Sequence, residues 1–331
     1  MTQQRIILTM CSNNTAQNLP VVLQFQLMSL SEDPELQPLL FGLFLLMYMV
    51  TVVGNLLIIL TVISDSHLHT PMYFFISNLS WSDICFISTT VPKMILDIQT
   101  QSRVISYVGC LTQMSMFIIF GCMDSMLLTA MAYDRFVAIC HPLHYTTIMN
   151  NHLCGLLVLV CILISLLDSQ VHNLIVLQFT YFKDMQISNF FCDPSQLLNL
   201  DCSLMFTKNI ITHLFGVFLG LFSTSGILIS YYKIISTMQR LPSTNGKYKA
   251  FSTCGSHLSV VCLFYGTGIG VYIGSTVSNS PENCAVASLM YTVITPLMNP
   301  FIYSLKNKDI KSSLWRFQKR TTCLPNSFHH F

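Results

Sequence analysis

The 331-residue chain is strongly apolar: 52% of its residues are hydrophobic, only 9% are charged, and its formal net charge is +2. A soluble domain carries about 25% charged residues, so water cannot be the solvent for most of this surface, and lipid is the natural alternative. The small net charge gives no support for a nucleic-acid partner. The thirteen cysteines contain no Cys-x-x-Cys pair, which argues against zinc knuckles and favours their use as small apolar fillers inside helices.

Seven stretches are long and apolar enough to cross a bilayer, which takes about 20 residues of helix. The first has no charged residue between Leu39 and Ile63, whereas the fourth carries Asp168 and His172 in its second half. Prolines in the second and seventh stretches are tolerable because neighbouring helices satisfy the freed carbonyls. The sequence therefore predicts an all-α protein, a seven-transmembrane helix bundle at 39–305 between an N-terminal segment (1–38) and a tail (306–331). The predicted spans are 39–63, 72–96, 108–140, 153–176, 207–235, 249–274 and 285–305.

The distribution of lysine and arginine predicts the orientation of the bundle. The segments on the C-terminal side of the membrane hold eleven of them and the segments on the other side hold five. Because positive charge stays cytoplasmic, we expect an extracellular N-terminus and a cytoplasmic C-terminus in a multi-pass plasma-membrane protein. Asn13 begins an N-glycosylation acceptor triplet in the outer segment, which agrees with this orientation. The first ten residues do not resemble a signal peptide, so the first span is expected to act as the targeting signal.

A short amphipathic helix is predicted directly after the last span. Ile310, Leu314 and Phe317 fall on one helical face among basic residues, the pattern of a helix that lies on the inner leaflet. The alternative is a solvated basic tail.

Two carboxylates lie near the middle of predicted spans, Asp83 in the second and Asp124 in the third. Ionisable groups at this depth indicate function, and neither span offers a basic partner. Two interpretations stay open: the pair, with Asn55, Ser125 or Asn299, holds a small cation such as sodium, or both acids are neutral and fix helix packing.

Two further features lie near the cytoplasmic ends of spans. Asp134 and Arg135 close the third span; they form either an ion pair that opens when a partner inserts or an interfacial arginine that reaches into the headgroups. In the seventh span, Pro300 removes a backbone hydrogen bond, and Asn299 is expected to compensate with its side chain. A weak point there suits a helix that must shift.

Several segments together resemble the odorant receptor branch of the rhodopsin-like G-protein-coupled receptors, over about 40–320. The most specific are MAYDRFVAIC, which ends the third span, and KAFSTCGSHL, which opens the sixth. Further matches are Gly54-Asn55, PMYFFISNLSWSD (71–83) and PLMNPFIYSLKN (296–307).

The resemblance implies roles for individual residues. Asp134 and Arg135 would be the activation switch, with Tyr133, the 136–147 stretch and the Asn299-Pro300-x-x-Tyr303 element, and the partner would be a stimulatory heterotrimeric G protein that raises cyclic AMP. Asp83 and Asp124 correspond to the family's buried acids, which favours sodium with Asn55 and Asn299; no other cofactor is expected. Odorants would bind in the outer half of the bundle, against Phe117, Ile118, Gly121, Cys122, Tyr265, Gly268 and Tyr272.

The composition of this region suits a small, mostly apolar volatile ligand that is held by burial. An amine would favour a carboxylate on the outer third span, and Phe117 occupies that position. The sequence therefore argues against an amine receptor.

Cys110 and Cys192 both face the oxidising side in this arrangement, so we expect a disulfide between them, as the family also has. Cys202 is a departure, because Tyr181 occupies its expected partner position. The resemblance thus implies a free thiol in the outer loop.

Other classes of function fit less well. Ser256 and His257 are adjacent, but neighbouring helical residues point about 100° apart, and no catalytic motif is present, so an enzyme is not expected. A small-solute transporter would explain buried acids and broken helices, but the chain has no inverted repeat. A rhodopsin-like receptor for peptides or lipids is the nearest alternative.

Overall fold

A computed structural model describes residues 24–31, 33–177, 185–199, 206–240, 244–276 and 281–322, and it places the side chains of most of them. Asn13, Tyr181 and Cys202, on which the glycosylation and free-thiol predictions depend, lie outside the described residues.

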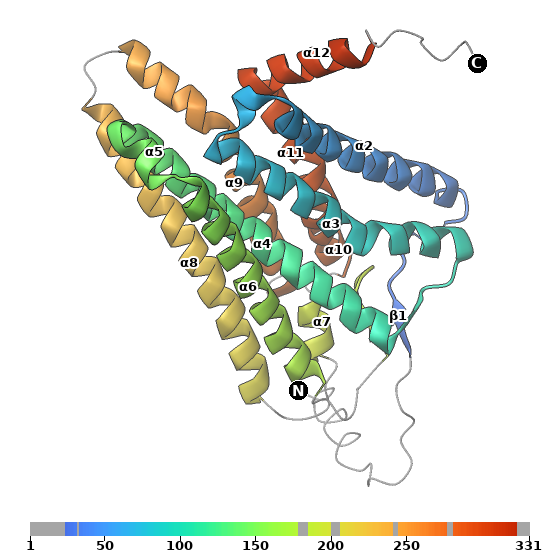
Figure 1. Cartoon of the computed structure of the whole chain (residues 1–331). Coiled ribbons are helices and arrows are strands. Elements are labelled where there is room, and N and C mark those ends of the chain that lie inside the picture. Colours follow the sequence, from blue (N-terminus) through green and yellow to red (C-terminus); the bar gives the residue numbers. More distant parts are fainter. Residues whose placement is uncertain are drawn as a thin grey trace.

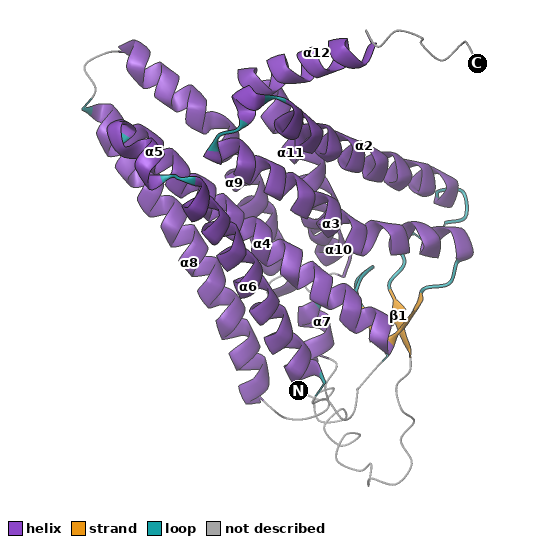
Figure 2. Cartoon of the chain, in the orientation of Figure 1, coloured by secondary structure: helices purple, strands orange, loops and turns teal. Residues whose placement is uncertain are grey.

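The described chain is an all-α bundle, as predicted, with one small sheet (Figures 1 and 2). Within the described residues, six helices are long and apolar enough to cross a membrane. The predicted span that is missing from these six is the second in chain order, 72–96. It corresponds to α3, a helix of 30 residues whose average hydropathy is lowered by Asp83, Lys93 and Asp97. The long helices are α2 (Gln37–Ser64), α3 (Pro71–Thr100), α4 (Tyr107–Cys140), α6 (Asn151–Val176), α8 (Phe206–Gln239), α9 (Thr244–Thr276) and a seventh span made of α10 (Pro281–Leu289), a π-helical turn η3 (Met290–Ile294) and α11 (Thr295–Lys306).

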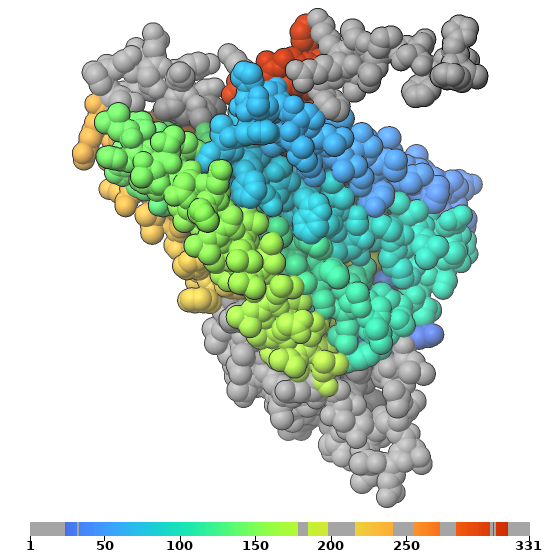
Figure 3. All heavy atoms as spheres, in the orientation of Figure 1, coloured from blue at the N-terminus to red at the C-terminus, as the bar shows by residue number. Residues whose placement is uncertain are grey.

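Short elements connect these spans. They are η1 (Ser66–Leu68), η2 (Pro142–His144), α5 (Tyr145–Ile148) and α7 (Pro194–Asn199). The central helix is α4, which packs against α3, α6, α8 and α9. In Figure 3, α2, α3, α4 and α6 lie side by side on one face of the molecule.

The bundle reverses the usual distribution of polarity. Large apolar side chains such as Leu46, Leu167 and Leu221 are more than half exposed, while Asn55, Asp124 and many hydroxyl groups are buried. Apolar side chains on the outside suit lipid as the solvent, and polar groups must then find partners inside.

A three-stranded sheet at one end was not predicted. Strand β1 (Gln24–Leu27) pairs antiparallel with β2 (Val104–Ser106) and parallel with β3 (Gln186–Ile187). The sheet ties the N-terminal segment to the α3–α4 connection and to the connection between α6 and α8, so the segment before the first span is partly structured. We call this the disulfide end of the bundle, since it also holds the Cys110–Cys192 bond.

At the opposite end, α12 (Lys308–Thr322) lies across the bundle (Figure 1). Its predicted apolar face is visible at Ile310, which is fully buried, and at Leu314, which packs on the core; the Phe317 side chain is not described. Tyr73 donates to the Asp309 carboxylate at 2.8 Å. Arg316 donates to Asp65 of the α2–η1 junction at 2.7 Å. Hydrogen bonds from Ser313 and Arg316 hold the pKa of the Asp65 carboxyl well below its usual range.

Candidate ligand cavity and signalling site

A cavity of about 270 Å³ opens between α4, α6, α8, α9 and the seventh span. Five of the seven predicted ligand residues line it, namely Phe117, Ile118, Gly121, Cys122 and Tyr265. Gly268 does not line the cavity but lies behind it, where an added methyl group would contact the Tyr291 ring at 3.8 Å. The side chain of Tyr272 lies outside the described residues.

Tyr291 is a cavity residue that the sequence analysis missed. It lies in the π-helical turn η3, and such turns are frequent at functional sites because the extra residue redirects the helix face. Its hydroxyl would approach a methyl group on Gly121 to 3.2 Å, a tight contact, so glycine at that position of α4 leaves the most room for the ring. Tyr291 also makes edge contacts with Phe86 and Phe117; Phe117 lines the cavity, and Phe86 packs against both of these rings.

Three hydroxyl groups close the inner side of the cavity. Ser125 and Ser223 lie 2.7 Å apart, and both contact the Tyr265 hydroxyl, at 3.0 and 2.9 Å. The residues come from α4, α8 and α9, so this hydroxyl triangle joins three helices beneath the ligand cavity.

Two cavity residues on α6 were noted in the sequence but given no role. Asp168 and His172 both line the cavity, and the His172 Nδ1 atom lies 3.3 Å from Asp168 Oδ1.

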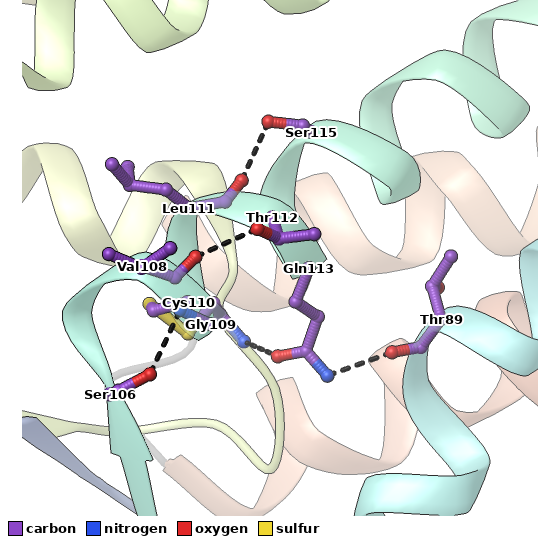
Figure 4. The surroundings of a disulfide bond; sticks show 10 residues. Thr89, Ser106, Val108, Gly109, Cys110, Leu111, Thr112, Gln113 and Ser115 are labelled. Carbon is purple, nitrogen blue, oxygen red and sulfur yellow. Dashed lines mark hydrogen bonds between the residues drawn. A yellow bond between two sulfur atoms is a disulfide. The ribbon is translucent and has the colours of Figure 1, made fainter.

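The disulfide between Cys110 and Cys192 has a Cα–Cα separation of 5.4 Å and joins the loop before α7 to the start of α4. Gln113 reinforces the attachment: its Oε1 accepts from the Cys192 amide and its Nε2 donates to the Thr89 carbonyl, both at 2.9 Å. Figure 4 shows Gln113 reaching from α4 toward Thr89 near the disulfide. One buried side chain therefore holds the loop to both α4 and α3.

Asp83 of α3 and Asp124 of α4 are both buried, and they are close enough to interact electrostatically. Asn299 donates to both Asp83 oxygens, at 2.9 and 3.0 Å. Among the described residues, Asp124 Oδ1, Asn299 Oδ1 and Asn55 Oδ1 are buried without a hydrogen-bond partner. Hard oxygen atoms that lack donors are what a small cation would satisfy, so the residues present fit a sodium ion.

The carbonyl that Pro300 leaves without a helical donor belongs to Pro296, four residues earlier. Asn55 of α2 donates to this carbonyl at 3.4 Å. The expectation that Asn299 compensates was therefore wrong: Asn299 bonds to Asp83, and the compensating donor comes from another helix. Gly54 permits the approach, because a methyl group there would lie 3.2 Å from the Pro300 ring.

The Asp134–Arg135 pair is formed, with Arg135 donating to Asp134 Oδ2 at 2.7 Å. The other carboxylate oxygen accepts from the Tyr145 hydroxyl at 2.7 Å, a contact that the sequence analysis did not identify. Tyr133 is 38% exposed at the same end, whereas Tyr303 is buried with no partner for its hydroxyl among the described residues.

His257 joins three helices near this switch. Its Nε2 lies 3.0 Å from the Leu128 carbonyl and its Nδ1 lies 2.7 Å from the Tyr231 hydroxyl. Since a carbonyl only accepts, Nε2 carries the proton and Nδ1 accepts from tyrosine. Both ring nitrogens are thus engaged, which leaves none for catalysis with Ser256.

The fold is that of a rhodopsin-like receptor. Squid rhodopsin superposes with a TM-score of 0.62 over 88% of each chain at 17% identity, so the two chains share the fold of a seven-helix membrane bundle.

The sequence comparisons narrow this class to one family. A profile described as olfactory receptor matches residues 44–320. Olfactory receptor 7E178 of Mus musculus is 67% identical over 92% of both chains, and olfactory receptor 7E24 of Homo sapiens is 67% identical over 92% of this chain and 90% of its own. Olfactory receptor 7D4 of Homo sapiens is 58% identical over 94% of this chain and 99% of its own.

The chain belongs to the olfactory receptor family. It is therefore a multi-pass plasma-membrane receptor and not an enzyme. Membership also implies a small-molecule ligand and coupling to a G protein.

Proposed function

We propose that this receptor binds small, mostly apolar volatile odorants in the cavity beside Tyr291 and activates a stimulatory heterotrimeric G protein, which raises cyclic AMP. The observation that carries the proposal is the cavity itself. It is small, about 270 Å³, and largely apolar, and aromatic side chains from α4, α9 and η3 line it. Such a site gains affinity mainly from burial of the ligand's apolar surface.

The proposed orientation places the disulfide end outside and the α12 end in the cytoplasm. Arg135, Lys233 and Arg316 gather at the α12 end, which agrees with the rule that positive charge is cytoplasmic. An antibody to the tail should label this receptor only after cells are permeabilised.

Side chains connect the cavity with the proposed G-protein surface. Tyr265 extends from the cavity to the hydroxyl triangle, and His257 on the same helix links α4 to α8. A ligand that moves Tyr265 would favour one arrangement of α9 against α4 over another. The Asp134–Arg135 pair lies on the same helix, α4, so this change would reach it. The ligand has to bind the two arrangements with different affinity to shift their populations.

The decisive experiment expresses the receptor in cells and screens volatile odorants with a cyclic AMP readout. Arg135→Ala should abolish the response without loss of surface labelling, because the switch loses its cation. Arg135→Lys is the matched variant that keeps the charge. An undiminished cyclic AMP response in Arg135→Ala would refute the proposed switch, and uptake of a labelled solute would instead favour a transporter. Activation by peptides but by no volatile would favour a non-odorant receptor.

We also propose that a sodium ion is held between Asp83 and Asp124, with Asn299 and Asn55 as neighbouring oxygen donors. Two buried carboxylates this close repel when both are charged, and a monovalent cation would offset that repulsion. The purified receptor should melt at a higher temperature in sodium chloride than in choline chloride of equal ionic strength. Asp124→Asn should remove this difference; equal melting of the unmodified receptor in both salts would refute the site.

A further inference from the structure

The polar side chains of α6 divide into two groups by their partners. Ser165 donates to the Cys161 carbonyl at 2.7 Å, Ser169 donates to the Ser115 carbonyl at 3.3 Å, and Asn173 donates to the Ser115 hydroxyl at 2.8 Å. The Ser165 bond lies within α6, and the other two bonds attach α6 to α4, so all three side chains have partners inside the protein. Asp168 differs, since among the described residues its Oδ1 is buried without a hydrogen-bond partner.

Asp168 lies in the wall of the ligand cavity although it is only 6% exposed. An unsatisfied buried carboxyl group is costly, so its presence in an apolar cavity calls for a partner that enters from outside. Among the described residues, the side-chain atom that approaches that oxygen is His172 Nδ1, at 3.3 Å, and Nδ1 is already hydrogen-bonded to the Asp168 backbone carbonyl at 2.9 Å.

His172 completes the polar end of the cavity. Its Nδ1 lies 2.9 Å from the backbone carbonyl of Asp168 and 3.3 Å from the Asp168 carboxylate. Because the carbonyl only accepts, Nδ1 carries a proton, and Nε2 is the ring atom left for a ligand. The hydroxyl triangle on the inner side does not need a hydrogen-bond partner from a ligand, since Ser125, Ser223 and Tyr265 bond to one another.

From this geometry we infer that the Asp168–His172 pair selects odorants with a hydroxyl group, so that the receptor's preferred ligands are small apolar alcohols; this inference rests on the proposed odorant-receptor function. The alcohol oxygen binds at the α6 wall and its hydrocarbon part packs against Phe117 and Tyr291.

A hydroxyl group fits this pair better than other small polar groups because it both donates and accepts. When Asp168 is ionised, its oxygens accept from the alcohol. When Asp168 is protonated and His172 is neutral with its proton on Nδ1, the Asp168 hydroxyl group donates to the alcohol and Nε2 accepts from it. Ethers and aldehydes only accept, so they leave an acceptor of the pair unsatisfied.

An amine is a weaker match than an alcohol. His172 lies next to the Asp168 carboxylate and can itself supply the positive charge, so a cationic ligand would compete with a partner that the protein already holds. Desolvation of the ammonium group would add a further cost.

The test compares isomeric ligands on the full-length receptor in cells. Octan-1-ol and heptyl methyl ether have the same atoms and nearly the same shape, as do cyclooctanol and cycloheptyl methyl ether. We expect each alcohol to be more potent than its ether by about tenfold or more, the effect of one buried unsatisfied group. Cyclic AMP and surface labelling are read in parallel.

Substitutions at the pair assign the preference to it. Asp168→Leu keeps the approximate size of the side chain and should remove the difference between alcohol and ether, while His172→Phe should reduce it. Asp168→Asn retains one acceptor and one donor and should keep part of the preference, which provides a second variant should the leucine form fail to reach the surface. Ser169→Ala is the matched control on the same helix and should leave the potency ratio unchanged.

The outcomes separate this inference from the proposed function. Equal potency of alcohol and ether on the unmodified receptor overturns the inference, and so does a preference that survives in surface-expressed Asp168→Leu. Responses to other volatiles but to no alcohol, or a greater potency of octan-1-amine than of octan-1-ol, also overturn it. In each case the receptor still answers odorants, whereas failure of the proposed function would leave every volatile without effect.

Discussion

The contact between Asn55 and the Pro296 carbonyl makes a quantitative prediction about how the receptor tolerates its proline break. Asn55→Ala removes a donor from α2 that is fully buried. The carbonyl of Pro296 then has no helical amide, because Pro300 lacks one, and no water is available at this depth. The receptor should therefore lose stability although neither residue contacts ligand.

The magnitude follows from the bond itself. An unsatisfied buried acceptor costs about 1–3 kcal/mol, while hydrogen bonds between membrane helices average about 0.6 kcal/mol and reach about 1.7 kcal/mol. The 3.4 Å separation between Asn55 Nδ2 and the Pro296 oxygen is long for such a bond, so we expect a loss of about 1 kcal/mol. In a protein of this size, that lowers the melting temperature by about 1–2 °C.

The assay can use the receptor's own thiols. Cys154, Cys161, Cys254 and Cys284 are free and buried, so a thiol-reactive fluorogenic dye reports unfolding of detergent-purified protein. Each variant is compared with Thr61→Ala, which removes a buried hydroxyl group of α2 that donates within its own helix at 2.6 Å.

A double-mutant cycle with Pro300→Ala provides the refutation. Alanine restores an amide that can donate to the Pro296 carbonyl, so Asn55→Ala should then cost less than it does beside proline. The Thr61→Ala control should cost the same in both backgrounds. If Asn55→Ala lowered the melting temperature equally with and without Pro300, the freed carbonyl would not be the reason that Asn55 matters.

Three other substitutions test contacts elsewhere in the bundle. Gly226→Ala should destabilise the receptor by about 1–3 kcal/mol, since the new methyl group would lie 2.8 Å from the Thr129 methyl group; in the same melting assay Thr129→Ser should relieve the loss, and no relief would contradict the steric reason. Gln113→Leu should reduce surface labelling severalfold, because the Cys192 amide of the loop and the Thr89 carbonyl of α3 both lose their buried partner; unchanged labelling would show that the disulfide alone suffices. The depressed pKa of Asp65 means that its stabilisation of α12 is complete above the ordinary carboxyl pKa of about 4 and is lost as the pH falls below it. A spin label on α12 should therefore keep its mobility between about pH 7 and about pH 5, whereas Arg316→Gln should increase that mobility already at about pH 7.

The spans could be predicted from the sequence because lipid imposes a strict requirement on each of them. A helix that crosses a bilayer needs a long apolar stretch, and this requirement does not depend on how the helices pack. The bounds agree to within a few residues at most ends, as for the span predicted at 108–140 and found at Tyr107–Cys140. The Asp134–Arg135 contact is equally local, since adjacent residues on one helix end can meet in any packing.

Contacts between helices could not be predicted in this way. Asp83 and Asn299 are 216 positions apart and Asn55 and Pro296 are 241 apart, and whether they meet depends on the rotation of each helix about its axis. The prediction for Asn299 was wrong for this reason. Asn299 is the neighbour of Pro300 in sequence, but its side chain faces α3. Tyr291 was missed for a related reason, because the π-helical turn changes the face that its ring occupies.

The seventh span concentrates its irregularities between the ligand cavity and the switch. The π-helical turn places Tyr291 against the cavity, and about two and a half turns further along the helix Pro300 removes a backbone bond. Between these points, α11 is attached to α2 and α3 by two side chains, Asn55 and Asp83, and such bonds are individually weak inside membranes. A helix held in this way can move at its α12 end without breaking its own backbone ladder, because the ladder is already interrupted there. We therefore expect a ligand that displaces Tyr291 to shift α11 at little energetic cost. Tyr303 lies on α11 and would move with this helix, and its buried hydroxyl has no partner among the described residues.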